Sequence, residues 1–155
     1  MPQHAPPRGG TVLVVDDDLA LRALFEMYLE SFGYDPLVAA DGDAALRLAA
    51  EHPEIQVIML DIVMSGISGS ELSLQLTTLL PEVTILYCSG HPLEALVRLG
   101  IEVPASRFIQ KPCRPEVWKQ RLNELFALRW RRRSKAKTAS PQLTPSAPTR
   151  ILCGS

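Results

Sequence analysis

The chain has 155 residues, 46% of them hydrophobic, which is enough for one compact domain with tails and makes a second folded domain unexpected. Its formal net charge of −1 hides an uneven distribution, because residues 129–155 hold seven of the 16 Lys and Arg residues and no acid. Residues 1–128 therefore combine nine bases with 17 acids, a formal charge of −8.

Three further features concern cellular location. The sequence has no apolar run that could act as a signal-peptide core, and none that approaches the roughly 20 residues of a membrane span. The three cysteines are odd in number and lack the spacing of a metal site. We therefore expect a cytoplasmic protein with reduced thiols.

Residues 1–10, with three prolines and two glycines, are predicted to form a disordered lead-in. From Thr11 the chain alternates between short apolar runs and helical periodicity, and the first run ends in three aspartates, Asp16 to Asp18. Asp18 is interpreted as the start of the following helix. The predicted strands are residues 11–15, 34–40, 55–60, 83–88 and 107–110, and the predicted helices are about 19–32, 41–52, 70–80, 92–99 and 115–126.

Five strands that alternate with five helices indicate an α/β fold with a parallel sheet between two helical layers. Pro36 cannot donate a ladder hydrogen bond, so the second strand belongs at an edge of the sheet. The short and more polar fifth strand suits the opposite edge. The sequence therefore predicts a flavodoxin-like (βα)5 three-layer sandwich with strand order 2-1-3-4-5.

Polar residues follow four of the five predicted strands, and parallel strands bring such residues to one edge of the sheet. Three carboxylates at that edge favour a hard divalent cation with oxygen ligands, such as Mg²⁺, and the accompanying donors suit phosphoryl oxygens. This combination indicates phosphoryl transfer to a carboxylate. The residues are Asp16 and Asp17 after the first strand, Asp61 after the third, Ser89 and Gly90 after the fourth, and Lys111 after the fifth.

Four motifs at the ends of these strands resemble the receiver domain of two-component response regulators, over about residues 11–128. The resemblance implies a stand-alone receiver of the single-domain type, followed by a basic tail at 129–155. The motifs are VVDD at 14–17, D-x-x-M at 61–64 with Gly69 further on, SG at 89–90 and KP at 111–112.

The resemblance also implies roles for the acidic residues. Asp61 would be the phospho-acceptor, and the donor would be a phosphohistidine of a histidine kinase or a phosphotransfer protein. Asp17 and Asp61 would bind Mg²⁺ directly, Asp16 would act mainly through a bound water, and the backbone carbonyl of Val63 would complete the protein ligands.

Other roles concern the response to phosphorylation. Lys111 would pair with the phosphoryl group, and the Lys111-Pro112 bond is expected to be cis, as X–Pro bonds readily permit. Ser89 would move toward the phosphoryl group together with Phe108, which occupies the switch-aromatic position of the family. These movements would change the affinity for a downstream protein partner at the face formed by the fourth helix, fifth strand and fifth helix, and the resemblance leaves open a phosphorylation-dependent homodimer.

The sequence departs from the family pattern at several positions. Ser65 replaces a usual proline, Phe108 replaces the usual tyrosine, and Cys113 stands where a large apolar residue is common. Val63 and His91 occupy the positions that tune the lifetime of the phosphoryl group. Their expected effects oppose each other, because an apolar Val63 would hinder the attacking water and His91 would hydrogen-bond it.

We therefore expect a phospho-acceptor switch, not a turnover enzyme, although it would assist its own phosphorylation and dephosphorylation. Three alternatives stay open at this point. The chain could be a relay or phosphate-sink receiver without output of its own, a metal-dependent phosphatase, or a regulator that binds nucleic acid through its tail. The phosphatase is disfavoured because such enzymes commonly carry D-x-D near the first strand.

The tail can be interpreted in two ways. Residues 129–137, RWRRRSKAK, continue the last helix into a basic run, which is followed by a Ser/Thr/Pro-rich stretch without apolar periodicity. A contact with nucleic acid or an anionic membrane is one interpretation, and a solvated, disordered tail is the other. The second is favoured because no folded reader accompanies the charges, and a nucleic-acid partner is accordingly not expected.

Overall fold

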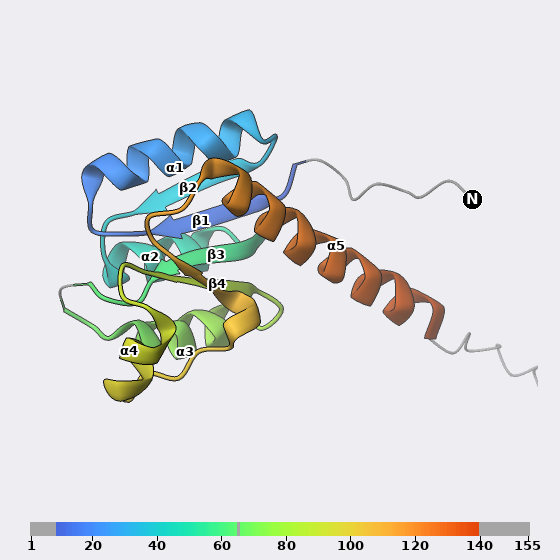
Figure 1. The fold of residues 1–155 in the computed structure, drawn as a ribbon. Helices are drawn as coiled ribbons and strands as arrows, with labels where there is room; N and C mark the ends of the chain where they lie inside the picture. Colours follow the sequence, from blue (N-terminus) through green and yellow to red (C-terminus); the bar gives the residue numbers. More distant parts are fainter. Residues whose placement is uncertain (1–8, 65, 140–155) are drawn as a thin grey trace, which may run out of the picture.

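The computed structural model describes residues 9–64 and 66–139 and forms one parallel sheet in the strand order β2-β1-β3-β4-β5. Figure 1 shows the sheet between helices on its two sides. The elements are β1 (Thr11–Val15), α1 (Leu19–Ser31), β2 (Asp35–Ala39), α2 (Gly42–Glu51), β3 (Ile55–Asp61), α3 (Gly69–Leu79), β4 (Thr84–Ser89), α4 (Leu93–Arg98), η1 (Ala105–Arg107), β5 (Phe108–Gln110) and α5 (Pro115–Ala139).

The strand order confirms the flavodoxin-like fold predicted from the sequence. Within the described residues, β2 pairs only with β1, where Pro36 lies opposite Val12. Because β2 is an edge strand, Pro36 removes no ladder bond to a further strand. The central strands β1 and β3 are almost wholly buried, in agreement with their uninterrupted apolar sequences.

Side-chain caps fix where the first three helices begin. The Asp18 carboxylate accepts hydrogen bonds from the backbone N–H groups of Ala20 and Leu21, at 2.9 and 3.1 Å, which confirms its predicted role at the start of α1. Asp41 caps α2 and Ser68 caps α3 in the same manner. Of the three consecutive aspartates, Asp18 is thus committed to local structure.

The hydrophobic core consists of two clusters, one on each face of the sheet. Alternate residues of β1 serve the two clusters, with Val12 and Val14 on one face and Leu13 and Val15 on the other. The first face is covered by α1 and α5, whose Phe25 and Trp118 rings meet edge to face with centroids 4.8 Å apart. The second face is covered by α2 and α3.

Helix α5 is longer than the sequence periodicity indicates. It runs to Ala139, so that residues 129–139 of the segment expected to be a disordered tail are helical. Figure 1 shows this part of α5 projecting past the ends of the strands. The rest of that segment, residues 140–155, and most of the expected lead-in, residues 1–8, lie outside the described residues. Within the described part of the chain, no helix combines the length and the apolar character that crossing a bilayer requires.

Candidate functional site

The carboxyl ends of four strands place the predicted site residues at one edge of the sheet. Asp16 directly follows β1, Asp61 ends β3, Ser89 ends β4 and Lys111 directly follows β5. Two backbone hydrogen bonds continue the pairing beyond the strands, from Asp16 N to the Ala39 carbonyl at 3.2 Å and from Lys111 N to the Ser89 carbonyl at 2.7 Å. The site backbone is therefore held by the sheet itself.

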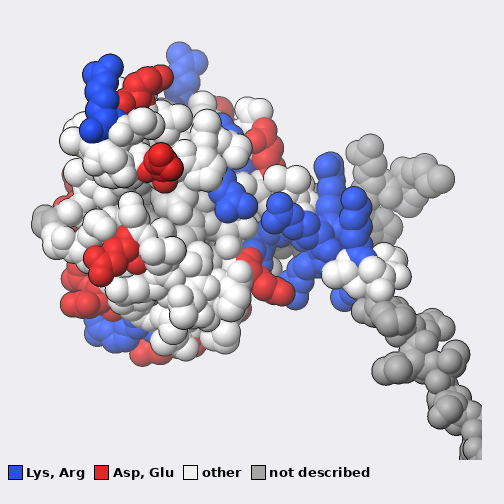
Figure 2. Space-filling view, turned by 90° about the horizontal axis from the view of Figure 1, so that it is seen from below, with Lys and Arg blue, Asp and Glu red and all other residues white. Residues whose placement is uncertain are grey.

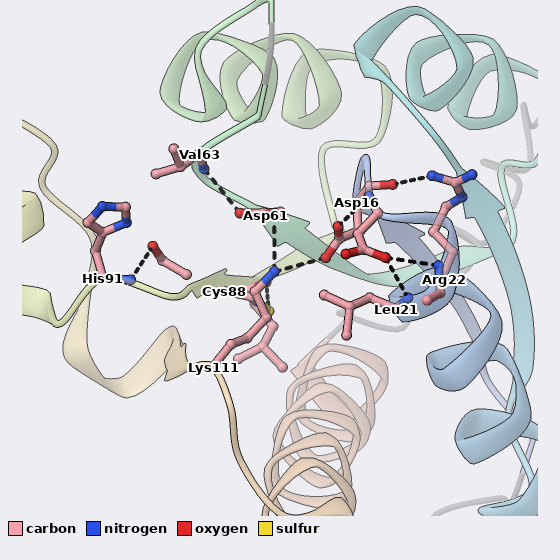
Figure 3. A network of polar contacts seen from close by, with 12 residues as sticks. Asp16, Leu21, Arg22, Asp61, Val63, Cys88, His91 and Lys111 are labelled. Atoms are coloured by element: carbon pink, nitrogen blue, oxygen red, sulfur yellow. Dashed lines mark hydrogen bonds and ion pairs between the residues drawn. The ribbon is translucent and has the colours of Figure 1, made fainter.

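An ammonium group lies between two carboxylates at the centre of the site (Figure 3). Lys111 Nζ is 2.9 Å from Asp16 Oδ2 and 3.1 Å from Asp61 Oδ2. The side chains are well shielded, with 15% of Lys111, 4% of Asp16 and 9% of Asp61 exposed. Such shielding makes the ion pairs stronger than pairs on the open surface, and it makes any uncompensated charge costly.

The second oxygen of each carboxylate accepts a backbone hydrogen bond. Asp18 N donates to Asp16 Oδ1 at 2.9 Å, and Val63 N donates to Asp61 Oδ1 at 3.1 Å. The Arg22 guanidinium also donates to the backbone carbonyl of Asp16 at 2.9 Å. The two buried carboxylates thus have fixed orientations before any ligand binds.

Arg22 is a site neighbour that sequence reasoning missed. It lies six residues after Asp16, near the start of α1, and no motif distinguishes it from a surface arginine. Its contact also goes to a backbone carbonyl, which leaves no trace in a residue pattern. Its effect is to hold the turn that carries Asp16 against α1.

Asp17 completes an acidic cluster with Asp16 and Asp61. Each of the three offers one carboxylate oxygen, and these oxygens lie within 4.8 Å of one another, with Asp17 exposed at the mouth of the site. Three carboxylates and one ammonium give these four side chains a formal net charge of −2 when all are ionised. An all-oxygen set of this kind, open to water on one side, fits Mg²⁺, which binds few carboxylates and keeps several waters.

Burial and the neighbouring charges together shift the pKa values of two groups in the site. Burial raises the pKa of Asp61, and the attraction of Lys111 and the Val63 hydrogen bond offset this only in part. Burial acts to lower the pKa of Lys111, but the hydrogen bond to Asp16 and the charge of Asp61 outweigh it, so the pKa is raised. The two directions agree physically, because one ammonium serves two carboxylates and each carboxylate receives only a share of it.

The other predicted residues surround this centre. Ser89 is fully buried, and its hydroxyl oxygen accepts a hydrogen bond from His91 N at 3.0 Å. His91 is exposed, and Val63 is 45% exposed with its side chain pointing away from Asp61 (Figure 3). Phe108 is partly buried at the start of β5, opposite Tyr87.

Two further features predicted from the sequence lie next to Lys111, namely the bond to Pro112 and the thiol of Cys113. The Lys111-Pro112 peptide bond is cis, as the resemblance implied. Cys113 packs partly buried against the core on the α1 and α5 face, and burial raises the pKa of its thiol. A raised pKa lowers the fraction of thiolate, so the surroundings of Cys113 favour an inert thiol.

Comparison with known proteins places this geometry in a family. The family model described as the response regulator receiver domain matches residues 12–123. The alkaline phosphatase synthesis transcriptional regulatory protein PhoP of Bacillus subtilis is 31% identical over 133 residues, which cover 85% of this chain and 52% of that protein. Protein PetR of Rhodobacter capsulatus is 32% identical over 152 residues, covering 97% and 60% of the two chains. The chain thus spans little more than half the length of these curated relatives.

Solved structures give the same result. The receiver domain of the hybrid histidine kinase CckA is 28% identical with a TM-score of 0.63, covering 76% of this chain and 99% of that one. A CheY-like receiver domain protein from Methanospirillum hungatei JF-1, at 23% identity and a TM-score of 0.67, covers 79% and 98% and supports the fold alone. With the four strand-end motifs and the acidic site in place, this chain belongs to the response regulator receiver domain family.

Proposed function

We propose that Asp61 accepts a phosphoryl group from a phosphohistidine of a histidine kinase or a histidine phosphotransfer protein. The observation that most supports this role is the position of Lys111, whose ammonium contacts Asp61 and Asp16 together. An anionic acceptor beside a fixed cation can receive a transferred phosphoryl group whose oxygens the same cation stabilises. Asp61 is also buried at the end of β3, where Val63 N and Lys111 Nζ hold its two carboxylate oxygens.

The chemical step forms one bond and breaks another. A carboxylate oxygen of Asp61 attacks phosphorus, the phosphorus–nitrogen bond breaks, and the imidazole nitrogen keeps the electron pair and takes up a proton. Asp16, Asp17, Asp61 and the Val63 carbonyl would hold Mg²⁺, which supplies positive charge to the phosphoryl oxygens. Lys111 remains as the fixed cation of the chain itself, with its pKa raised and its charge therefore kept at neutral pH.

The phosphoryl group of the product carries nearly two negative charges and replaces the single charge of the Asp61 carboxylate, so a site that is already acidic becomes more negative. In our proposal Ser89 responds first, by exchanging its hydrogen bond from His91 N for one to the phosphoryl group. Ser89 pairs with Gln110 of β5, and Gln110 comes two residues after Phe108. A movement of Ser89 would therefore be passed to the strand that carries Phe108. The face formed by α4, β5 and α5 would then bind a downstream protein partner with changed affinity.

This account makes the protein a switch, with phosphoryl uptake and hydrolysis as steps that its own residues assist. A relay or phosphate-sink role would use the same uptake chemistry without the partner-binding face. Hydrogen exchange across α4, β5 and α5 separates the two roles. Phosphorylation should change exchange on that face for a switch, and unchanged exchange there would favour the relay role.

Incubation with acetyl phosphate and Mg²⁺ tests the acceptor. The wild-type chain should gain one phosphoryl mass, and the Asp61→Asn variant should gain none. Asp41→Asn is the matched control, because the Asp41 carboxylate caps α2 and is not part of the acidic cluster of Asp16, Asp17 and Asp61, and asparagine retains capping. Equal phosphorylation of Asp61→Asn and the control would refute the assignment.

The prediction that the receiver acts without an attached output domain stays a prediction. The mass of the endogenous protein, measured from cells by immunoblot or intact mass spectrometry, tests it. A species of the size of this chain agrees with the stand-alone form, and a longer one contradicts it.

A further inference from the structure

The feature of the structure that the receiver chemistry does not use is the carboxyl-terminal part of α5, residues 129–139, called here the basic extension. Six of its eleven residues are basic and none is acidic, whereas residues 1–128 carry a formal charge of −8. Figure 2 shows Lys and Arg side chains gathered on a segment that projects from the body. The six basic residues are Arg129, Arg131, Arg132, Arg133, Lys135 and Lys137.

The basic extension is anchored at its first residue and exposed beyond it. The Arg129 guanidinium donates a hydrogen bond to the backbone carbonyl of Glu82, in the loop before β4. Residues 131–139 are all exposed. Burial lowers the pKa of Arg129, and the neighbouring charges of Arg133 and Arg132 lower it further while Glu82 acts to raise it. The basic extension therefore concentrates positive charge on the last turns of α5, whose earlier turns pack into the core.

The distribution of these charges excludes several occupants. With 3.6 residues per turn, the six basic residues fall on most of the helix circumference, and Trp130 is the only large apolar side chain among residues 129–139. A helix that lies on a membrane needs a broad apolar face, which the basic extension lacks. A second copy of the extension would be repelled by like charge and would find no apolar seam.

We propose that the basic extension binds the sugar-phosphate backbone of duplex DNA. The basic side chains spread around most of the helix, so a partner should present negative charge on two sides of it. A groove of duplex DNA does this, because a phosphate backbone runs along each of its edges. The extension is about 16 Å long, and a helix about 10–12 Å across fits a major groove about 12 Å wide. Four of the six basic residues are arginines, whose planar guanidinium groups bind phosphate in a bidentate manner.

The proposal reverses the interpretation of the tail that the sequence favoured, in which no nucleic-acid partner was expected. The expectation against nucleic acid rested on a tail without folded structure, and the helix removes that premise for residues 129–139. Arg129 holds the start of the basic extension against the loop that carries Glu82, and the rest of the extension projects from the domain body (Figure 2). The proposal does not depend on phosphorylation of Asp61, and either can fail without the other.

The test is fluorescence anisotropy of the full-length chain with a labelled duplex of mixed sequence over a range of salt concentrations. If about four cations meet phosphates, the logarithm of the affinity should fall with the logarithm of salt with a slope of about −4. Trp130 provides a second signal, because its side chain is 42% exposed while Trp118 is 3% exposed. Quenching of tryptophan fluorescence by DNA should therefore come from Trp130.

Two variants of equal charge separate a local site from a general charge effect. Arg131→Gln/Arg132→Gln/Lys135→Gln and the control Arg47→Gln/Arg98→Gln/Arg114→Gln each remove three positive charges, which takes the formal net charge from −1 to −4. All six side chains are exposed. The first variant should lose at least about tenfold in affinity and reduce the salt slope by about 2–3, and the control should bind as the wild type does.

Several results would overturn the proposal. They are the absence of binding at low salt, equal losses in both variants, tighter binding to single strands than to the duplex, equal affinity for polyglutamate, or binding to anionic vesicles in preference to DNA. Circular dichroism and acetyl phosphate uptake should be the same for both variants. A first variant that keeps both properties and loses DNA affinity supports the proposal, and one that keeps both with its DNA affinity intact contradicts it.

Discussion

Lys111 Nζ lies 2.9 Å from Asp16 Oδ2, although 95 residues separate the two in the chain. The contact joins the residue after β5 to the residue after β1, across the two strands β3 and β4. The same ammonium reaches Asp61 at the end of β3. The acceptor carboxylate, its acidic neighbour and the fixed cation are thus one electrostatic unit, and changes to one member alter the others.

Removal of the cation should destabilise the protein at neutral pH. Lys111→Met leaves Asp16 and Asp61 shielded from water without their ammonium partner, which should lower the free energy of unfolding by about 1–3 kcal/mol. Chemical denaturation in the presence of a chelator measures the loss. Lys135→Met, at an exposed lysine on α5, is the control and should stay close to the wild type. Equal stability of the two variants would contradict the described role of Lys111.

The stability should depend on pH through Asp61. Its pKa is raised in the folded state by burial, so the unfolded chain loses this proton first as the pH rises. The resulting loss of stability is absent below the ordinary carboxyl pKa, about 3.9, and complete above the raised pKa. Asp61→Asn removes this loss, and without divalent cations it should unfold at a higher temperature than the wild type at pH 7.

The advantage of Asp61→Asn should shrink as the pH approaches about 4, where the wild-type carboxyl group also becomes neutral. Thermal unfolding in a chelator at both pH values tests this, with Asp41→Asn as the control. An Asp61→Asn variant less stable than the wild type at pH 7 would show that the attraction of Lys111 outweighs the cost of burial.

Mg²⁺ should stabilise the folded chain, because the acidic cluster is assembled only in the folded state. At a concentration about 100 times the dissociation constant, the expected gain in the free energy of unfolding is about 2.7 kcal/mol. Asp17→Asn should lose most of this gain. Asp18→Asn should keep it, since Asp18 is the cap of α1 and asparagine caps helices equally well. A similar response to Mg²⁺ in both variants would argue against Asp17 as a ligand.

Gly69 holds the loop after Asp61 in place through a close backbone approach. A Cβ atom at this position would lie 2.8 Å from the Cα and carbonyl oxygen of Ile62, next to the acceptor. Gly69→Ala should therefore cost about 1–3 kcal/mol and disturb phosphoryl uptake, because the Val63 hydrogen bond to Asp61 comes from the same loop. Ser70→Ala, at the adjacent exposed position, should leave both properties near those of the wild type.

Much of the fold could be predicted because local signals agree with the tertiary arrangement. Uninterrupted apolar runs mark β1, β3 and β4, and Pro36 marks the edge strand. Knowledge of the strand order then places Asp16, Asp61 and Lys111 at one end of the sheet, which is why the sequence alone indicates the site. The cap at Asp18 was predictable for the same reason, since it depends only on neighbouring residues.

Other features depend on contacts that no sequence pattern carries. The hydrogen bonds of Arg22 and Val63 join a side chain to a backbone atom. Any residue type can supply the backbone atom, so the sequence does not indicate the contact. The sequence indicates that the basic run continues the last helix, but it does not show where α5 ends, because the last eleven residues have no apolar face that would mark a helix. The motifs predict that Lys111, Asp16 and Asp61 lie in one site. They do not show that Lys111 contacts both carboxylates at once, which only the interatomic distances reveal.

The central claim, that Asp61 is the acceptor of a phosphoryl group, is tested most directly by the chemistry of the modified residue. Intact mass measurement after incubation with acetyl phosphate, followed by treatment with hydroxylamine, distinguishes an acyl phosphate from a phosphoester, because only the acyl phosphate is cleaved. We predict a single added phosphoryl group that requires Mg²⁺, maps to the peptide containing Asp61 and is removed by hydroxylamine. A phosphoryl group that resists hydroxylamine, or that maps elsewhere, would contradict the account.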